Sequence, residues 1–105
     1  MDRILVVEDT DSLREVLVRV LESEGYEVSS ASSAEDAINV LREGDFTMVL
    51  SDLKLPRRSG LDLLKQAREL PKTCPMVVMT AYGNVEIAVE AMKLGATDFI
   101  TKPLS

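Results

Sequence analysis

The 105-residue sequence contains no histidine and a single cysteine, Cys74. Without an imidazole the chain cannot form Ser-His-Asp or Cys-His catalytic groups, and it lacks ligands of the usual zinc sites. One thiol can form neither an internal disulfide nor a cysteine-ligated metal cluster, which is typical of proteins in a reducing cytoplasm. The chemistry that remains is that of carboxylates, hydroxyls and lysines.

Other common features are also missing. Acidic residues outnumber basic ones by 18 to 12, so the chain has no basic footprint for nucleic acid. It contains neither a glycine-rich dinucleotide fingerprint nor a P-loop, which argues against nucleotide binding. No apolar run approaches the roughly 20 residues that cross a bilayer, and the apolar run at 3–7 leaves no room for a signal peptide. We therefore expect a cytoplasmic protein that binds neither membranes nor nucleic acid directly.

The length suits one domain with a single core. Apolar and β-branched runs predict strands at 3–7, 26–31, 47–50, 76–80 and 97–101, the one at 26–31 near an edge. Helical spacing of apolar residues predicts helices at 12–24, 34–43, 61–67 and 85–94. Thr10 or Asp11, Ser33 and Asn84 are the candidate N-caps. This alternation predicts an α/β fold, a doubly wound parallel sheet with right-handed crossovers and helices on both faces.

The stretch 46–56 organises the rest of the chain. Its apolar run is typical of a buried strand, Asp52 stands where the run stops, and Pro56 prevents its continuation. Polar residues follow three of the other four strands in the same way, and the carboxyl ends of parallel strands share one rim, where such folds bind ligands. The predicted rim set is Glu8-Asp9, Asp52, Thr80 and Lys102.

Three clustered carboxylates repel one another unless a cation offsets their charge. A few carboxylate oxygens suit Mg²⁺, and with the metal in place Asp52 could attack a phosphoryl group as a nucleophile. Lys102 and the metal would then hold the phosphoryl oxygens, and Thr80 would donate a hydrogen bond to one of them.

Four short motifs carry a resemblance to a known family. With Glu8-Asp9, Ser51-Asp52, Thr80-Ala81 and Lys102-Pro103 each at a strand end, the chain resembles the receiver domain of two-component response regulators. The stretches 52–56, 79–83 and 88–96 resemble receivers of sigma-54-dependent transcriptional activators in particular. The resemblance covers the whole chain and implies a flavodoxin-like sheet of strand order 2-1-3-4-5.

The resemblance also implies the metal site. Asp9 and Asp52 would bind Mg²⁺ directly, together with the main-chain carbonyl of Lys54. Glu8 would act through bound water, and it stands where aspartate is commoner in the family.

It implies the phosphoryl and switch residues as well. Asp52 would be the phosphoacceptor, and Lys102 would contact the phosphate from a cis peptide bond to Pro103. Thr80 and Phe99 would form the switch pair, with Phe99 standing where tyrosine is frequent.

The implied function is a signalling switch rather than an enzyme acting on an external substrate. A histidine kinase or phosphotransfer protein would supply the phosphoryl group. The surface formed by 85–94 and 97–101 would then control a C-terminal output domain that regulates transcription, and two receivers could form a homodimer. We expect residues 1–105 to be one receiver domain, truncated before a fifth helix. Without that helix, one face of the strands at 3–7 and 47–50 should lack cover.

Several alternatives stay open. An aspartate-nucleophile phosphohydrolase would need a second acid two residues after Asp52, where the chain has Lys54, and a cap domain. An interaction module that is never phosphorylated is a further reading. The pair Arg57-Arg58 is either a solvated turn or a docking site. Apolar residues spread around more than one face of the helix at 85–94, which favours a partner surface. These residues are Val85, Ile87, Ala88, Val89, Ala91, Met92 and Leu94.

Overall fold

The computed structural model describes residues 2–81 and 84–102. In these residues strands and helices alternate: β1 (Arg3–Val7), α1 (Asp11–Ser23), β2 (Glu27–Ala31), α2 (Ala34–Glu43), β3 (Met48–Asp52), α3 (Gly60–Arg68), β4 (Met76–Thr80), α4 (Val85–Lys93) and β5 (Asp98–Thr101). The strands form one parallel sheet in the order β2-β1-β3-β4-β5. This confirms the expected fold and strand order, with β2 at an edge. None of the helices described is long and apolar enough to span a membrane.

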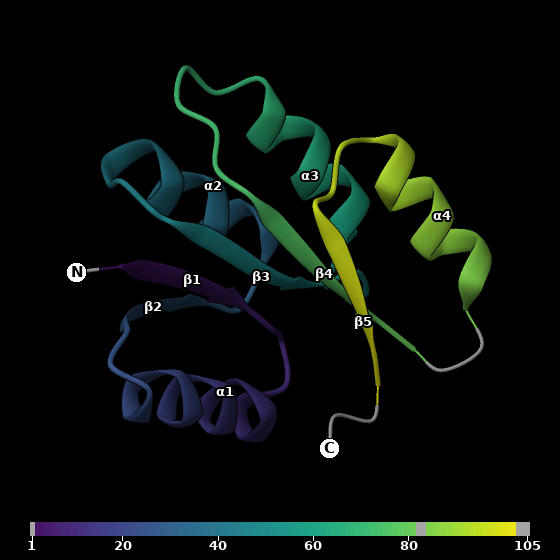
Figure 1. The fold of residues 1–105 in the computed structure, drawn as a ribbon. Helices are drawn as coiled ribbons and strands as arrows, with labels where there is room; N and C mark the ends of the chain where they lie inside the picture. The colour runs from purple at the N-terminus through teal and green to yellow at the C-terminus, as the bar shows by residue number, and fades with distance from the viewer. Residues whose placement is uncertain (1, 82–83, 103–105) are drawn as a thin grey trace.

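The helices cover both faces of the sheet (Figure 1). The helices α2, α3 and α4 lie on one face, and α1 lies on the other. The larger core cluster joins buried side chains of α2, α3 and α4 to the sheet, with Leu63 and Leu64 of α3 almost fully buried. The smaller cluster is built around Leu17 of α1. The central strands are therefore buried on both faces, as their unbroken apolar runs predict.

The expectation that β1 and β3 lack cover on one face was wrong. Ile4, Val6 and Leu50 are only 3%, 0% and 7% exposed, because they pack together with Leu17 and with Met79 of β4. Long side chains from neighbouring strands close this face together with α1. Exposed apolar side chains occur instead on α1, at Val16 and Val20, and on β5, at Ile100.

Most element boundaries fall within a residue of their predicted positions, but the caps differ. Ser33 caps α2 by accepting a hydrogen bond from the Asp36 N–H, as expected. Thr10 and Asn84 occupy the N-cap positions of α1 and α4 without making a side-chain cap hydrogen bond. No N-cap is predicted from the sequence for the helix at 61–67, yet Ser59 forms a capping box with Asp62 and α3 starts at residue 60.

A glycine lets α3 begin directly against the end of β3. The Gly60 N–H donates to the Leu53 carbonyl at 2.8 Å. A Cβ at this position would overlap the carbonyl oxygen of Asp52 and lie 2.6 Å from the Cα of Leu53. Because only glycine permits this approach, Gly60 helps to fix the backbone that carries Asp52.

We predict that Gly60→Ala destabilises the fold by about 1–3 kcal/mol, because an added methyl must push two backbone segments apart. Urea denaturation of the parent and variant measures the difference. Gly44→Ala is the matched control, since its Cβ would lie 3.2 Å from side-chain atoms of Arg3 and Phe46 and no closer than 3.7 Å to backbone, the Val40 oxygen. A Gly60→Ala variant no less stable than Gly44→Ala would show that this approach is not tight.

Candidate functional site

The structure brings the predicted rim residues together at the carboxyl ends of the strands. Glu8 and Asp9 follow β1, and Asp52 and Thr80 are the last residues of β3 and β4. Lys102 follows β5, and its backbone N–H donates to the Thr80 carbonyl at 2.8 Å. The structure thus places these residues at one edge of the sheet, as the sequence predicts.

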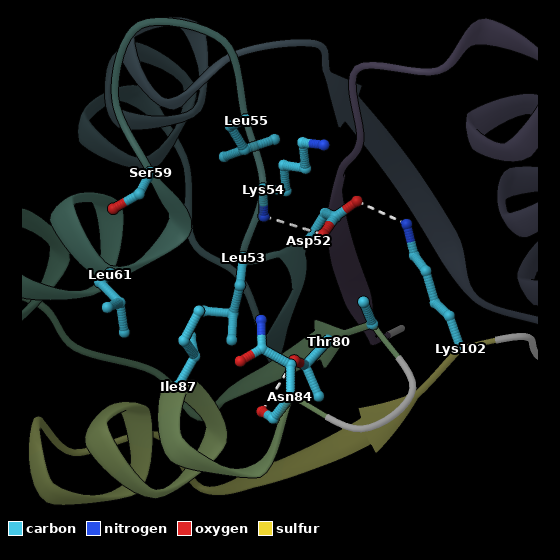
Figure 2. Close-up of a pocket in the computed structure, with 11 residues that line it drawn as sticks. Asp52, Leu53, Lys54, Leu55, Ser59, Leu61, Thr80, Asn84, Ile87 and Lys102 are labelled. Carbon is cyan, nitrogen blue, oxygen red and sulfur yellow. Dashed lines mark hydrogen bonds and ion pairs between the residues drawn. The ribbon is translucent and has the colours of Figure 1, made fainter.

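A single ammonium group joins two of the carboxylates. Lys102 Nζ lies 2.5 Å from Asp52 Oδ2 and 3.1 Å from Glu8 Oε1. The other oxygen of Asp52, Oδ1, accepts the backbone N–H of Lys54 at 2.9 Å. Figure 2 shows Asp52 between these two donors. Burial alone would lower the pKa of Lys102, but its hydrogen bonds and charge interactions with Asp52 and Glu8 raise it overall.

Glu8 is the most deeply buried charge in the site. Its side chain is 0% exposed, and Oε2 accepts the Thr10 N–H at 2.9 Å. Burial raises the pKa of Glu8 above its ordinary value, and the neighbouring Asp52 adds to this, while the Thr10 and Lys102 hydrogen bonds oppose it. Removing water from the carboxylate outweighs the donors that replace it.

The donor set fits a small, hard divalent cation. Carboxylate oxygens of Glu8, Asp9 and Asp52 lie within 4.8 Å of one another. Asp9 is exposed, whereas Glu8 and Asp52 are buried. Oxygen ligands with an open, solvent-facing side match Mg²⁺, which keeps several of its waters.

Thr80, the last residue of β4, lines the same cavity as Asp52. It is 2% exposed, and its hydroxyl donates to the main-chain oxygen of Asn84 at 3.5 Å. Both residues line a cavity of about 340 Å³ that also reaches Asp52 and Lys102. The cavity has room for a phosphoryl group beside Asp52, with the Lys54 N–H, Thr80 and Lys102 around it (Figure 2).

Phe99 lies apart from this cavity. It sits on β5, pairs in register with Val78 and is 40% exposed. The predicted switch partner of Thr80 is therefore on the surface in this structure. The predicted cis peptide bond to Pro103 lies outside the described residues.

Sequence reasoning missed several residues of the site. The side chains of Leu55, Leu61 and Ile87 form an apolar wall of the cavity, and Arg14 donates to the Glu8 carbonyl at 2.8 Å. The capping-box spacing of Ser59 and Asp62 could have located the start of α3. No local pattern predicts the Arg14 contact, because it depends on how the loop after β1 turns.

Comparison with known proteins gives one family. A sequence model of the response regulator receiver domain matches residues 4–105. The transcriptional regulatory protein ZraR of Escherichia coli (strain K12) is 42% identical over 101 residues, which are 96% of this chain and 23% of ZraR. DltR of Streptococcus agalactiae is 40% identical over 96% of this chain and 45% of its own length. The chain thus spans less than half the length of these curated relatives.

Solved structures agree with this assignment. A receiver domain protein from Clostridium thermocellum has a TM-score of 0.93 at 29% identity, covering all of this chain and 85% of its own. NtrX from Brucella abortus has a TM-score of 0.92 at 34% identity, with 100% of this chain and 24% of NtrX covered.

The burial of Glu8 predicts a pH dependence of stability. Because its pKa is raised in the folded state, the folded protein binds the proton more tightly than the unfolded chain does. Stability of the metal-free protein should therefore fall as pH rises from the ordinary pKa through the raised one. The variant Glu8→Gln lacks this titration, so in EDTA its melting temperature should gain on that of the parent as pH rises from 4 to 7. If the melting temperature of Glu8→Gln minus that of the parent stays constant or falls between pH 4 and pH 7, the assignment is contradicted.

Proposed function

Because the chain belongs to the response regulator receiver domain family, we propose that Asp52 accepts a phosphoryl group and that α4 and β5 transmit the resulting change. The observation that carries this proposal is the buried Asp52 carboxylate, which shares one cavity with Thr80 and Lys102. The proposed phosphoryl donor is a phosphohistidine of a partner, a histidine kinase or a phosphotransfer protein, which fits the lack of a donor imidazole in these 105 residues.

In the transfer, an oxygen of Asp52 attacks the phosphorus atom of the phosphohistidine. The new O–P bond forms as the N–P bond breaks, and the electron pair of that bond leaves with the imidazole nitrogen. Lys102 moves from its pairing with Asp52 to the phosphoryl oxygens. The Lys54 N–H, which now donates to Asp52 Oδ1, and the Thr80 hydroxyl complete the set of donors.

The residues around Asp52 also suit the metal ion of the proposed site. Asp9 and Asp52 would hold Mg²⁺ directly together with the Lys54 carbonyl, and Glu8 would act through water. Bound Mg²⁺ supplies positive charge that offsets the carboxylates and the incoming phosphoryl oxygens.

The switch begins at Thr80. Its hydroxyl now donates to the Asn84 oxygen, and this oxygen also accepts the Ala88 N–H at 3.3 Å in the first turn of α4. If the hydroxyl turns toward a phosphoryl oxygen, α4 loses a contact at its N-terminus. Phe99 could then move inward toward Thr80, and both changes would alter one surface.

That surface carries the exposed apolar side chains Val85, Val89, Met92 and Phe99. Exposed apolar area of this kind marks a partner surface. Its partner in the longer protein would be an output domain that regulates transcription, since the curated relatives are transcriptional regulatory proteins. A second copy of the receiver would use the same surface.

The phosphohydrolase alternative gains no support from the geometry. At the position two residues after Asp52, where that mechanism needs an acid, the main-chain N–H of Lys54 faces the carboxylate. The Lys54 side chain is exposed.

We predict that the protein gains one phosphoryl group when it is incubated with Mg²⁺ and acetyl phosphate. Asp52→Asn should abolish this gain, because the amide is not a nucleophile. Lys102→Ala should still bind Mg²⁺ but weaken the switch. Intact-mass spectrometry measures the increment, with Asp62→Asn as a control carboxylate outside the site. A phosphoryl group retained in Asp52→Asn would refute the assignment.

We also predict that Thr80→Ala separates phosphorylation from the change in α4. The variant should still accept the phosphoryl group, since the nucleophile is intact, but phosphorylation should no longer alter amide hydrogen exchange in residues 85–93. Thr97→Ala is the control threonine outside the cavity, and it should respond like the parent. An undiminished response of α4 in Thr80→Ala would show that this hydroxyl does not carry the switch.

A further inference from the structure

Arg14, on the first turn of α1, contacts both ends of the loop that carries Asp9. Its Nη1 donates to the main-chain oxygen of Glu8 at 2.8 Å, and its Nη2 donates to Asp11 Oδ1 at 2.6 Å. The side chain is only 20% exposed. Because a guanidinium group is planar and rigid, two simultaneous hydrogen bonds fix the relative position of the groups they join.

Two backbone hydrogen bonds also restrain the loop: the Glu8 N–H donates to the Ala31 carbonyl at 3.1 Å, and the Arg14 N–H donates to the Thr10 carbonyl at 2.9 Å. Thr10, the N-cap residue of α1, makes no side-chain cap hydrogen bond. Within the loop, the Glu8 carboxylate accepts the Thr10 N–H at 2.9 Å. The backbone conformation of residues 8–11 therefore sets the direction of the exposed Asp9 side chain. The Arg14 side chain holds the main-chain oxygen of Glu8 at one end of that segment and the side-chain carboxylate of Asp11 at the other.

The second contact of Arg14 also occupies a carboxylate. Asp11 is two residues from Asp9, and its side chain is 82% exposed. Its carboxylate is absent from the group formed by Glu8, Asp9 and Asp52 in the described part of the chain. The ion pair with Arg14 keeps the Asp11 carboxylate beside the Arg14 side chain, where it does not join that group.

We propose that Arg14 is a positioning residue that makes the acidic site selective for Mg²⁺ over Ca²⁺. This inference rests on the proposed function, since it assumes that the site binds a divalent cation. Mg²⁺ requires near-ideal octahedral geometry and few protein ligands, whereas Ca²⁺ accepts six to eight oxygens in flexible arrangements. A rigid loop with Asp11 held away therefore favours Mg²⁺. A mobile loop with Asp11 released favours Ca²⁺.

Isothermal titration calorimetry with MgCl₂ and with CaCl₂ on the unphosphorylated protein tests this role. In Arg14→Met the Kd for Mg²⁺ should rise about tenfold, the usual size of the effect when a residue that orients a metal ligand is lost. The Kd for Ca²⁺ should rise less, so the Kd for Ca²⁺ divided by the Kd for Mg²⁺ should fall at least threefold. Adding Asp11→Asn to Arg14→Met should return that ratio toward the value of the parent.

Matched variants complete the design. Arg19→Met removes an exposed arginine from the same helix and should leave both constants unchanged. Arg14→Lys keeps the charge but cannot span both contacts, so it should lose part of the selectivity, and it replaces Arg14→Met if that variant does not fold. Unchanged Mg²⁺ affinity in the Arg14 variants, or an equal loss for both ions, overturns the proposal. A parent that binds Mg²⁺ no better than its Asp9→Asn variant refutes the metal site of the proposed function itself.

Discussion

The ion pairs of Lys102 hold together both the site and one edge of the sheet. Two buried carboxylates, Glu8 and Asp52, would be expensive to desolvate without a cation between them. Lys102 supplies this cation at 3.1 and 2.5 Å. It follows β5, whose residues are all exposed, whereas Glu8 and Asp52 belong to the ends of the buried strands β1 and β3. One side chain thus connects the outermost strand to the centre of the fold. The proposed phosphoryl transfer would have to rearrange the same ion pairs.

This arrangement gives the proposed switch a physical basis. While Lys102 is paired with Asp52, the charge of the proposed nucleophile is partly neutralised and Thr80 donates to Asn84 at the start of α4. A phosphoryl group on Asp52 would attract both Lys102 and the Thr80 hydroxyl, so contacts to β5 and α4 would change together. Because these two elements carry Val85, Val89 and Phe99 on the surface, a local exchange of hydrogen bonds can alter an interface without a large change in the core.

The sequence predicts the fold well, because unbroken apolar runs such as 76–80 read as buried strands and because the carboxyl ends of parallel strands must share a rim. The rim residues Glu8, Asp52 and Lys102 follow from that rule alone. The geometry of the side chains does not follow from that rule. The closeness of Gly60 to Asp52 depends on how α3 packs, and the cover over Leu50 depends on side chains from three elements. Neither appears as a periodic pattern in the sequence.

Glu8 in place of the commoner aspartate illustrates the same point. Its longer side chain uses both oxygens, Oε2 for the Thr10 N–H and Oε1 for Lys102. A carboxylate engaged in this way, buried and with a raised pKa, is less suited to bind a metal directly than the exposed Asp9. The hydrogen bonds thus favour Asp9 over Glu8 as a direct ligand of the proposed site, and they leave Glu8 to hold the loop and the lysine in place. The added methylene group therefore fits the proposed site, because it lets one side chain join the loop after β1 to the lysine after β5.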